Sequence, residues 1–285
     1  MPGIIGTGLL GQALVSRMLA ADLAVVGWDI DPIRLQELAG KGATPARAIE
    51  DVAPLSTIIL CLPDSQIVGQ VVQQLEQLVR PGCVIIDTTT GQPDASRRIA
   101  RRLEQLQVSY LDATVAGSSL QVEAGDGLLM VGGERKIYDD SQPLLDVLVG
   151  RHEYLGPSGA GATAKLIVNL ALGLNRAVLA ETLALAEAAG MDQLTMLEVL
   201  KNSAAYSAQM DSKGHKMIAR DYELQARLSQ HLKDVQLILE LGQHSECPLP
   251  LSEQHRTLLE RAVQQGLGDQ DNSAIREVWD KPSGQ

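Results

Sequence analysis

The chain has 285 residues, of which 45% are hydrophobic and 21% are charged, and its formal net charge is −11 at pH 7. This length favours two domains, and the hydrophobic content excludes an intrinsically disordered chain. The negative charge argues against a nucleic-acid-binding protein, because phosphate contacts need clustered Lys and Arg.

Targeting and metal-binding signals are weak in this sequence. No apolar stretch looks long enough to cross a membrane uninterrupted, and the first residues lack a charged n-region, so we expect a cytoplasmic protein without membrane contact. The cysteines are few and widely spaced, which favours buried thiols over a disulfide or metal site. The five histidines are scattered, so no metal is expected; His231 stands out only because it lies two residues before Lys233.

The first half of the chain alternates short β-branched runs with helical patterns. Strands are predicted at 3–5, 24–28, 57–62, 83–87, 109–112 and 128–131. Helices are predicted at 9–20, 32–39, 66–79 and 94–106. This alternation is typical of an α/β fold, a doubly wound and mostly parallel sheet of the Rossmann type, which we assign to residues 1–156.

The pattern changes after Leu155, and no further strand is predicted. A loop at 156–161 leads into an Ala- and Leu-rich helix at about 162–189 that is apolar on nearly every face and therefore expected to be buried. Gly190 is expected to end it and Asp192 to cap the next helix. Residues 157–285 thus form a predicted all-helical domain joined through the long helix, with breaks at Gly214, Gly242, Pro248, Pro250 and Gly266.

The segment Gly6-Thr7-Gly8-Leu9-Leu10-Gly11 follows an apolar run and opens a helix, which is the context of a dinucleotide-binding fingerprint. Gly6 is expected to make the tight turn, Gly8 to let a pyrophosphate approach the backbone, and Gly11 to allow close packing of helix on strand. The N–H groups at the helix start would bind the phosphates. The alternative is a glycine-rich turn without a ligand.

Asp29 directly follows the second predicted strand and lies 18 residues past Gly11, where an acid binds the adenosine ribose diol. A carboxylate there repels a 2′-phosphate, and Ile30 cannot neutralise one, so NAD is favoured over NADP as the cofactor. Alternatively, Asp29 only begins the turn at Asp31-Pro32.

Lys165 and Asn169 are four residues apart in the long helix and share one of its faces. Burial lowers the pKa of a lysine toward the range that is useful for proton transfer. Such an amine could protonate a carbonyl oxygen as hydride arrives, or accept the alcohol proton in the reverse reaction. The alternative is a lysine that reaches to water and an asparagine that ties helices together.

Six motifs, in order, resemble those of the β-hydroxyacid dehydrogenase family of the 3-hydroxyisobutyrate dehydrogenase type, over essentially the whole chain. The first is the Gly6–Gly11 fingerprint. The others are Leu62-Pro63-Asp64, Asp87-Thr88-Thr89-Thr90, Asp112-Ala113-Thr114-Val115-Ala116-Gly117-Ser118, the loop at 156–161 with Lys165 and Asn169, and Lys233-Asp234. The glyoxylate and succinic semialdehyde reductase branch falls within the same resemblance.

The resemblance implies Lys165 as the general acid/base and Asn169 as its orienting partner. It places Leu62, Pro63, Thr90 and Lys233 beside the cofactor. Ala116, Gly117, Ser118 and Asn169 would bind the substrate, with the backbone near Gly117 holding its carboxylate. Asp234 would fix Lys233 or the domain join, and Tyr222 would close the site or belong to the core.

Three residues of the substrate motif depart from the family pattern: Ala116 replaces a serine, Thr114 a proline and Ser118 a glycine. Losing a hydroxyl that contacts a charged group costs about 1.5–3 kcal/mol, so the particular substrate stays open. Ser118 or Ser119 could compensate. Two alternative functions remain, an imine reductase, whose family generally lacks the lysine, and a non-catalytic NAD-binding module. A homodimer or homotetramer is expected.

Overall fold

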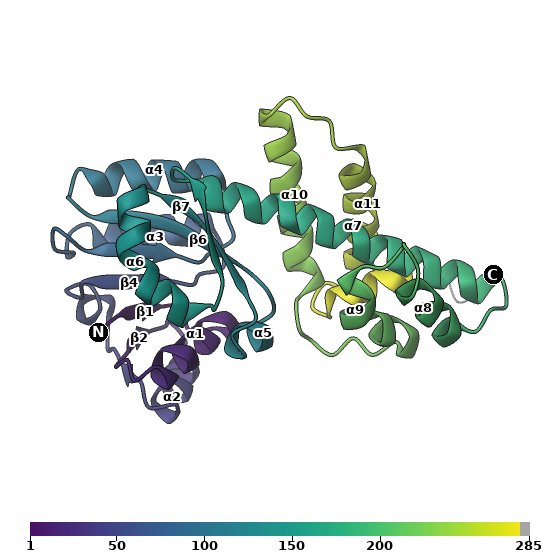
Figure 1. The fold of residues 1–285 in the computed structure, drawn as a ribbon, viewed down its shortest axis with the longest axis horizontal. Helices are drawn as coiled ribbons and strands as arrows, with labels where there is room; N and C mark the ends of the chain where they lie inside the picture. The colour runs from purple at the N-terminus through teal and green to yellow at the C-terminus, as the bar shows by residue number, and fades with distance from the viewer. Residues whose placement is uncertain (280–285) are drawn as a thin grey trace. The chain divides into compact units, whose positions relative to one another are not determined.

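The computed structural model describes residues 1–279, which form two compact units. Unit 1 comprises Met1–Lys165 and unit 2 begins at Leu166, so the division falls inside one helix, α7 (Ala160–Ala188) (Figure 1). The domain boundary that we predicted after Gly156 coincides with the end of the last strand and stays a prediction.

Unit 1 is built on one eight-stranded sheet with the order β3-β2-β1-β4-β5-β6-β7-β8. Its strands are β1 (Gly3–Ile5), β2 (Val26–Trp28), β3 (Thr44–Pro45), β4 (Thr57–Leu60), β5 (Val84–Asp87), β6 (Ser109–Ala116), β7 (Leu128–Gly133) and β8 (His152–Gly156). Only β6 and β7 pair antiparallel. The strand order reverses between β1 and β4, which is where open α/β sheets bind their ligands.

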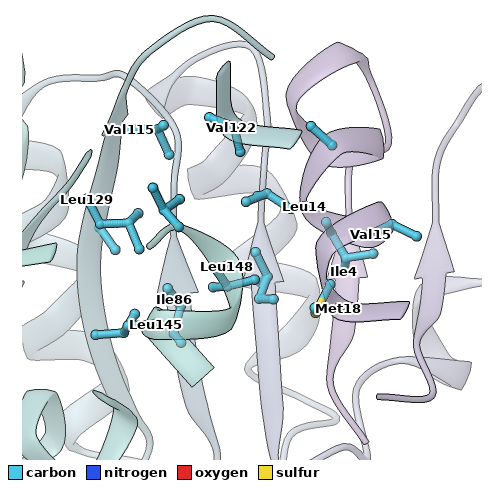
Figure 2. Close-up of a cluster of buried hydrophobic side chains, with 14 of the residues drawn as sticks. Ile4, Leu14, Val15, Met18, Ile86, Val115, Val122, Leu129, Leu145 and Leu148 are labelled. Carbon is cyan, nitrogen blue, oxygen red and sulfur yellow. The ribbon is translucent and has the colours of Figure 1, made fainter. Parts of the chain in front are cut away.

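Helices cover both faces of this sheet. They are α1 (Leu9–Ala20), α2 (Pro32–Gly40), the 3-10 turn η1 (Ile49–Asp51), α3 (Ser65–Leu75), α4 (Pro93–Glu104), α5 (Ser119–Glu123) and α6 (Arg135–Leu148). Successive strand residues point to opposite faces, and Ile4 and Ile5 accordingly belong to different hydrophobic clusters. The cluster of Ile4 includes Leu14 of α1 and Leu145 of α6 (Figure 2). The doubly wound, mostly parallel sheet is therefore confirmed.

Two strands, β3 and β8, were not predicted. β3 has two exposed residues, one of them Pro45, which lacks a backbone N–H and is tolerated at a sheet edge. β8 lies at the other edge and alternates exposed and partly covered residues. Edge strands bury little apolar surface, so their hydrophobic pattern is too weak to identify them.

Unit 2 is helical over its described residues, as predicted. After α7 it contains α8 (Gln193–Lys201), α9 (Ala208–Ala219), α10 (Leu228–His244), α11 (Pro250–Gln264) and the 3-10 segment η2 (Asn272–Trp279). Gly190 has φ +74° just beyond α7, and the Asp192 side chain accepts a hydrogen bond from Thr195 N, as a helix stop and a cap require.

The predicted helix breaks at Gly214 and Gly242 are wrong, because both glycines lie inside helices, α9 and α10. A Cβ on Gly214 would lie 2.7 Å from a Leu197 methyl carbon, and one on Gly242 would lie 2.6 Å from Leu249. Gly214 lets α8 approach α9, and Gly242 lets the connection before α11 approach α10. This close packing outweighs the low helix propensity of glycine.

Helix α7 differs from the expectation in two respects. Its length and apolar composition would allow a membrane span, a test that the core helix of a soluble protein also passes. It is also not buried all round, because Ile167, Val178 and Leu185 are 58%, 59% and 69% exposed. Its buried face carries polar Asn169 and Arg176, which hydrogen-bond to α10 and α9. Within unit 2, α7 is therefore a core helix with one open apolar face.

Candidate active site

The turn between β1 and α1 has a geometry that suits each of its three glycines. Gly6 has φ +91°, and a Cβ there would lie 2.2 Å from the Cys61 carbonyl oxygen. A Cβ on Gly11 would lie 2.2 Å from the Gly6 carbonyl oxygen, so the helix packs closely on the strand end. A Cβ on Gly8, by contrast, would meet nothing within 4 Å. The backbone is thus open at the one position where the fingerprint requires an approaching pyrophosphate.

The start of α1 provides an anion-binding end. Its N-cap, Gly8, has no side chain to cap the helix, and the first turn contains no acidic residue. The first N–H groups of a helix lack intrahelical partners and carry the positive end of the helix dipole. Together with the open backbone at Gly8, these groups fit a bound phosphate.

Asp29 follows β2 and ties the fingerprint turn to the next strand. Its Oδ2 accepts hydrogen bonds from Thr7 N at 2.6 Å and from Thr7 Oγ1 at 3.2 Å, and its Oδ1 accepts one from Asp31 N at 2.9 Å. Both interpretations of Asp29 are compatible, because an ionised carboxylate offers about four acceptor positions. Oδ1 accepts from Asp31 N at the start of the turn and still has an acceptor position for a ribose hydroxyl.

Predicted cofactor residues follow the carboxyl ends of three neighbouring parallel strands. Ile5, Leu60 and Asp87 are paired in register across β1, β4 and β5. Leu62 N, just beyond β4, donates to Thr89 Oγ1 at 3.0 Å and so joins the loops after β4 and β5. Pro63 is exposed and Thr90 is half-buried at the same edge. Unit 1 thus brings the fingerprint, Leu62, Pro63 and Thr90 to the carboxyl ends of its parallel strands.

The predicted substrate motif forms the end of β6 and the start of α5. Ala116 is the last, half-buried residue of β6, and Gly117 has φ +135°, a conformation that favours glycine. Ser118 is the N-cap of α5: its Oγ accepts from Gln121 N, and its own N–H donates to Gln121 Oε1. The Ser118 hydroxyl is therefore engaged in a capping box, which weakens the idea that it replaces the hydroxyl missing at Ala116.

The first residues of the substrate motif have a role that the sequence did not reveal. Asp112, only 1% exposed, accepts hydrogen bonds from Gly159 N at 2.7 Å and Ala162 N at 2.9 Å. Thr114 Oγ1 donates to the Gly161 carbonyl oxygen at 2.9 Å. Burial raises the pKa of Asp112 to about 6, although the two N–H donors oppose the shift. These contacts attach the start of α7 to the middle of β6.

Lys165 and Asn169 lie one turn apart on α7, as predicted. Lys165 is half-buried rather than fully buried, while Asn169 is 7% exposed. Asn169 Nδ2 donates to Asp234 Oδ2 of α10 at 3.0 Å, so the carboxylate holds the amide in place. Lys233, which precedes Asp234 in the sequence, is half-buried. Asp234 therefore fixes Asn169, a partner that we did not predict for it.

Two other residues of unit 2 have packing roles. Tyr222 packs against the hydrophobic core and donates its hydroxyl hydrogen to Glu277, so of its two predicted roles the structure shows the core one. His231 lies beside His255 with ring centroids 5.2 Å apart, and a Cβ on Gly173 would lie 2.5 Å from His231 Nε2. Among residues 1–279, no group of three or more His, Cys, Asp or Glu could hold a metal ion.

Comparison with known proteins gives the same picture over the full chain. Residues 2–156 match the NAD binding domain of 6-phosphogluconate dehydrogenase, and residues 159–279 match the NAD-binding family model of NADP-dependent 3-hydroxyisobutyrate dehydrogenase. The chain is 30% identical to 2-(hydroxymethyl)glutarate dehydrogenase of Eubacterium barkeri, covering 99% of this chain and 95% of that protein. It is 29% identical to glyoxylate/succinic semialdehyde reductase 1 of Arabidopsis thaliana, covering 97% of each.

A solved structure agrees with these matches. The crystal structure of 3-hydroxyisobutyrate dehydrogenase from Salmonella typhimurium has a TM-score of 0.90 and 26% sequence identity, and the match covers 97% of this chain and 99% of that chain. Fold and fingerprint define an NAD(P)-binding protein with a Rossmann domain and a helical second domain. Within that class, the chain belongs to the 3-hydroxyisobutyrate dehydrogenase family of NAD(P)-dependent hydroxyacid dehydrogenases.

Proposed function

We propose that this chain is an NAD-dependent dehydrogenase of a short 3-hydroxy acid, or the reductase of the matching semialdehyde or keto acid, with Lys165 as general acid/base. The observation that carries the proposal is the pairing on α7 of an amine, Lys165, with an amide one turn away, Asn169, which is itself held by Asp234 at 3.0 Å. A side chain with this support keeps its orientation during proton transfer.

The dinucleotide would be held by unit 1. The N–H groups at the start of α1 and the open backbone at Gly8 suit the pyrophosphate, and Asp29 suits the ribose diol. Thr90, Leu62, Pro63 and Lys233 are the proposed residues around the nicotinamide, which supplies or accepts hydride when it is bound. Asp29 and the exposed apolar Ile30 support NAD over NADP, because neither compensates the charge of a 2′-phosphate.

The protein's own contribution is the movement of one proton. In reduction, the Lys165 ammonium gives a proton from Nζ to the substrate oxygen as that oxygen gains electron density. In oxidation, the neutral amine accepts the hydroxyl proton. Asn169 orients the reacting oxygen or the amine. Because the same group serves both directions, the two directions require opposite protonation states of Lys165.

A short acid with a polar group near its reacting carbon is the proposed substrate class. The glycine conformation at Gly117 exposes backbone at the end of β6, and Ala116 leaves space where the family places a hydroxyl. The similar proteins are named for 2-(hydroxymethyl)glutarate, glyoxylate and succinic semialdehyde, all small carboxylic acids. These names support the class and leave the particular substrate to experiment.

We also propose that the protein is a homo-oligomer, a dimer or tetramer. Ile167, Val178 and Leu185 are exposed on one long helix, and apolar faces of this kind are usually covered in an assembly. A second copy of the same chain fits best, because two identical apolar helices bury one another in a self-complementary contact.

The decisive experiment replaces Lys165 with Ala and measures turnover of a panel of short 3-hydroxy acids and semialdehydes, together with NAD binding. We expect turnover to fall roughly 10²–10⁴-fold, the contribution of a general acid/base, while the Kd for NAD changes little. A matched control replaces Lys216, a half-buried lysine of α9 whose Nζ donates to the Glu223 carbonyl oxygen, with Ala.

Three outcomes would contradict the proposal. Full turnover by the Lys165→Ala variant would remove the amine from the chemistry. A wild-type protein that binds NAD but is inactive on every substrate of the panel would instead favour a non-catalytic NAD-binding module, and activity on cyclic imines alone would favour an imine reductase.

A further inference from the structure

We propose that Asp112 and Thr114 of β6 are positioning residues that clamp the first turn of α7 and thereby set the place of Lys165. This inference rests on the role proposed for Lys165. Neither residue carries an assigned function here beyond its place in the substrate motif, and Thr114 is one of the departures from the family pattern.

The carboxylate of Asp112 spans the first turn of α7. Its Oδ1 accepts from Gly159 N at 2.7 Å and its Oδ2 from Ala162 N at 2.9 Å. An N-cap side chain normally belongs to the residue just before the helix and satisfies one or two free N–H groups. Here the cap comes from a neighbouring strand, so it fixes the helix to the sheet as well as closing its end.

Thr114 adds a second attachment from the same strand. Its Oγ1 donates to the Gly161 carbonyl oxygen at 2.9 Å, and Thr114 is fully buried. A Cβ on Gly161 would lie 2.3 Å from the Met130 carbonyl oxygen and 2.4 Å from that of Asp112. The helix start therefore rests directly on the backbones of β6 and β7, and only glycine allows this approach.

The clamp acts on Lys165 through helix geometry. Gly161 and Lys165 are four residues apart in α7 and so lie on one face, about one turn apart. A rotation or translation of the first turn moves the Lys165 side chain by a similar amount. A misplacement of about 1 Å in a catalytic group can cost on the order of a hundredfold in rate.

The charge state of Asp112 gives the clamp a pH dependence. The titratable groups that interact with it are Asp87 and Tyr110 in the sheet, and the guanidinium of Arg97 from α4 lies beside Gly159, one of the residues that Asp112 bonds. Burial, the main cause, raises the pKa of Asp112 to about 6. Below that pH one carboxyl oxygen becomes an O–H donor and no longer accepts from the helix N–H facing it.

Loss of the clamp in acid need not unfold unit 1. The pKa of Asp112 in the folded protein, about 6, lies above its ordinary value of 3.8. The folded protein therefore binds this proton more readily than the unfolded chain, and the contribution of Asp112 to stability grows as pH falls from about 6 to about 4. Activity should thus decline while the fold persists.

The test measures kcat for semialdehyde or keto acid reduction between pH 5 and 8, the direction in which protonated Lys165 is the active form. We expect wild-type kcat to fall reversibly below about pH 6. Asp112→Asn should lower kcat on the order of tenfold to a hundredfold near pH 7 and remove this acid limb, with the Kd for the dinucleotide unchanged. Thr114→Val removes the hydroxyl and should lower kcat less than Asp112→Asn does. Thr114→Ser keeps the hydroxyl and should have the wild-type kcat.

Asp192→Asn is the matched control. Asp192 caps α8 by accepting from Thr195 N at 2.7 Å, so it has the same chemistry away from the start of α7. This variant should keep both kcat and the acid limb. If Asp112→Asn and Asp192→Asn have the same pH profile as the wild type, the clamp does not act on catalysis.

A second measurement does not depend on activity. Amide hydrogen exchange in residues 157–164 should be faster in Asp112→Asn than in the wild type, because Gly159 N and Ala162 N lose a charged acceptor. Unchanged exchange would overturn the clamp even in an active enzyme. Faster exchange in Asp112→Asn, together with a wild type that reduces no tested substrate, would keep the clamp and remove the proposed function. If Asp112→Asn does not fold, Thr114→Val and Thr114→Ser answer the same question.

Discussion

At the scale of single residues, the proposed preference for NAD rests on Asp29 and Ile30. Asp29 accepts hydrogen bonds from Thr7 and Asp31, so replacing it would disturb the fingerprint turn as well as the proposed ribose contact. Ile30 is 87% exposed, with its side chain outside the core. A change at Ile30 therefore tests cofactor preference with little structural cost.

Ile30→Arg should raise kcat/KM with NADP by about tenfold, because a guanidinium forms charge-assisted hydrogen bonds to a phosphate. Efficiency with NAD should change little. Ile30→Gln is the control, since glutamine has similar length and no charge. A wild type that already works as well with NADP as with NAD would contradict the preference for NAD, and an equal gain in the glutamine variant would exclude charge as the cause.

The sequence predicts residues whose role depends on local chain geometry. It misses residues whose role depends on contacts with distant parts of the chain. Gly6, Gly8 and Gly11 follow from spacing alone, because one turn of chain contains the whole geometry. Asp112 bonds Gly159, a residue far along the chain, and no local pattern announces such a contact. Asn169 was predicted by its spacing from Lys165, but its contact with the Asp234 carboxylate could be identified only from the folded structure.

At the scale of elements, the same distinction separates α1 from β8. Helix α1 was predicted with its observed bounds, because a fingerprint begins it and an apolar face runs through it. β8 pairs with only one neighbour and has exposed residues at alternate positions, so it lacks the apolar run of a central strand. Helix α7 was predicted as buried because its composition is apolar, but composition does not say which apolar face is covered within one chain.

The open face of α7 gives a prediction about assembly. Val178→Glu or Leu185→Glu should convert the proposed oligomer to monomers, because each places a charge within an apolar contact. Sedimentation equilibrium measures the change. Ile33→Glu on α2, a residue that is 61% exposed, is the control and should leave the oligomer intact. A monomeric wild type would contradict the proposal.

At the scale of the whole molecule, the two units should differ in what limits their stability. Unit 2 contains a buried ion pair in which Lys213 Nζ lies 2.9 Å from both oxygens of Asp271. Asp271 is fully buried and also accepts from Ala226 N and the Ser273 hydroxyl. Burial alone would raise the pKa of Asp271, but the donors outweigh it and hold the pKa below its ordinary value.

Asp271→Asn should therefore destabilise unit 2 by about 3–5 kcal/mol, because it leaves the Lys213 charge buried without its partner. In the wild type, this part of the stability is present above about pH 4 and is lost as pH falls further and Asp271 is protonated. Urea unfolding at several pH values measures both effects.

The two tryptophans separate the units in this experiment. Trp28 packs in unit 1 and Trp279 in unit 2, so variants that keep only one of them report each unit by its fluorescence. The Asp271→Asn effect should appear in the Trp279 signal and not in that of Trp28. Asp139→Asn, which breaks an exposed pair with Arg135 on α6, is the control and should change neither transition appreciably. An equal shift in both signals would contradict the assignment to unit 2.

The position of η2 in the chain has a consequence for biosynthesis. Ala274 and Ile275 are fully buried in the core that α9, α10 and α11 share, and they come from the last segment of unit 2 that the structure describes. At about 5–20 residues per second, the ribosome needs on the order of ten seconds to pass from Lys165 to this segment. During that interval the nascent chain contains the complete Rossmann sheet followed by apolar helices that are not yet covered by η2. We expect chaperones to bind these helices of the nascent protein.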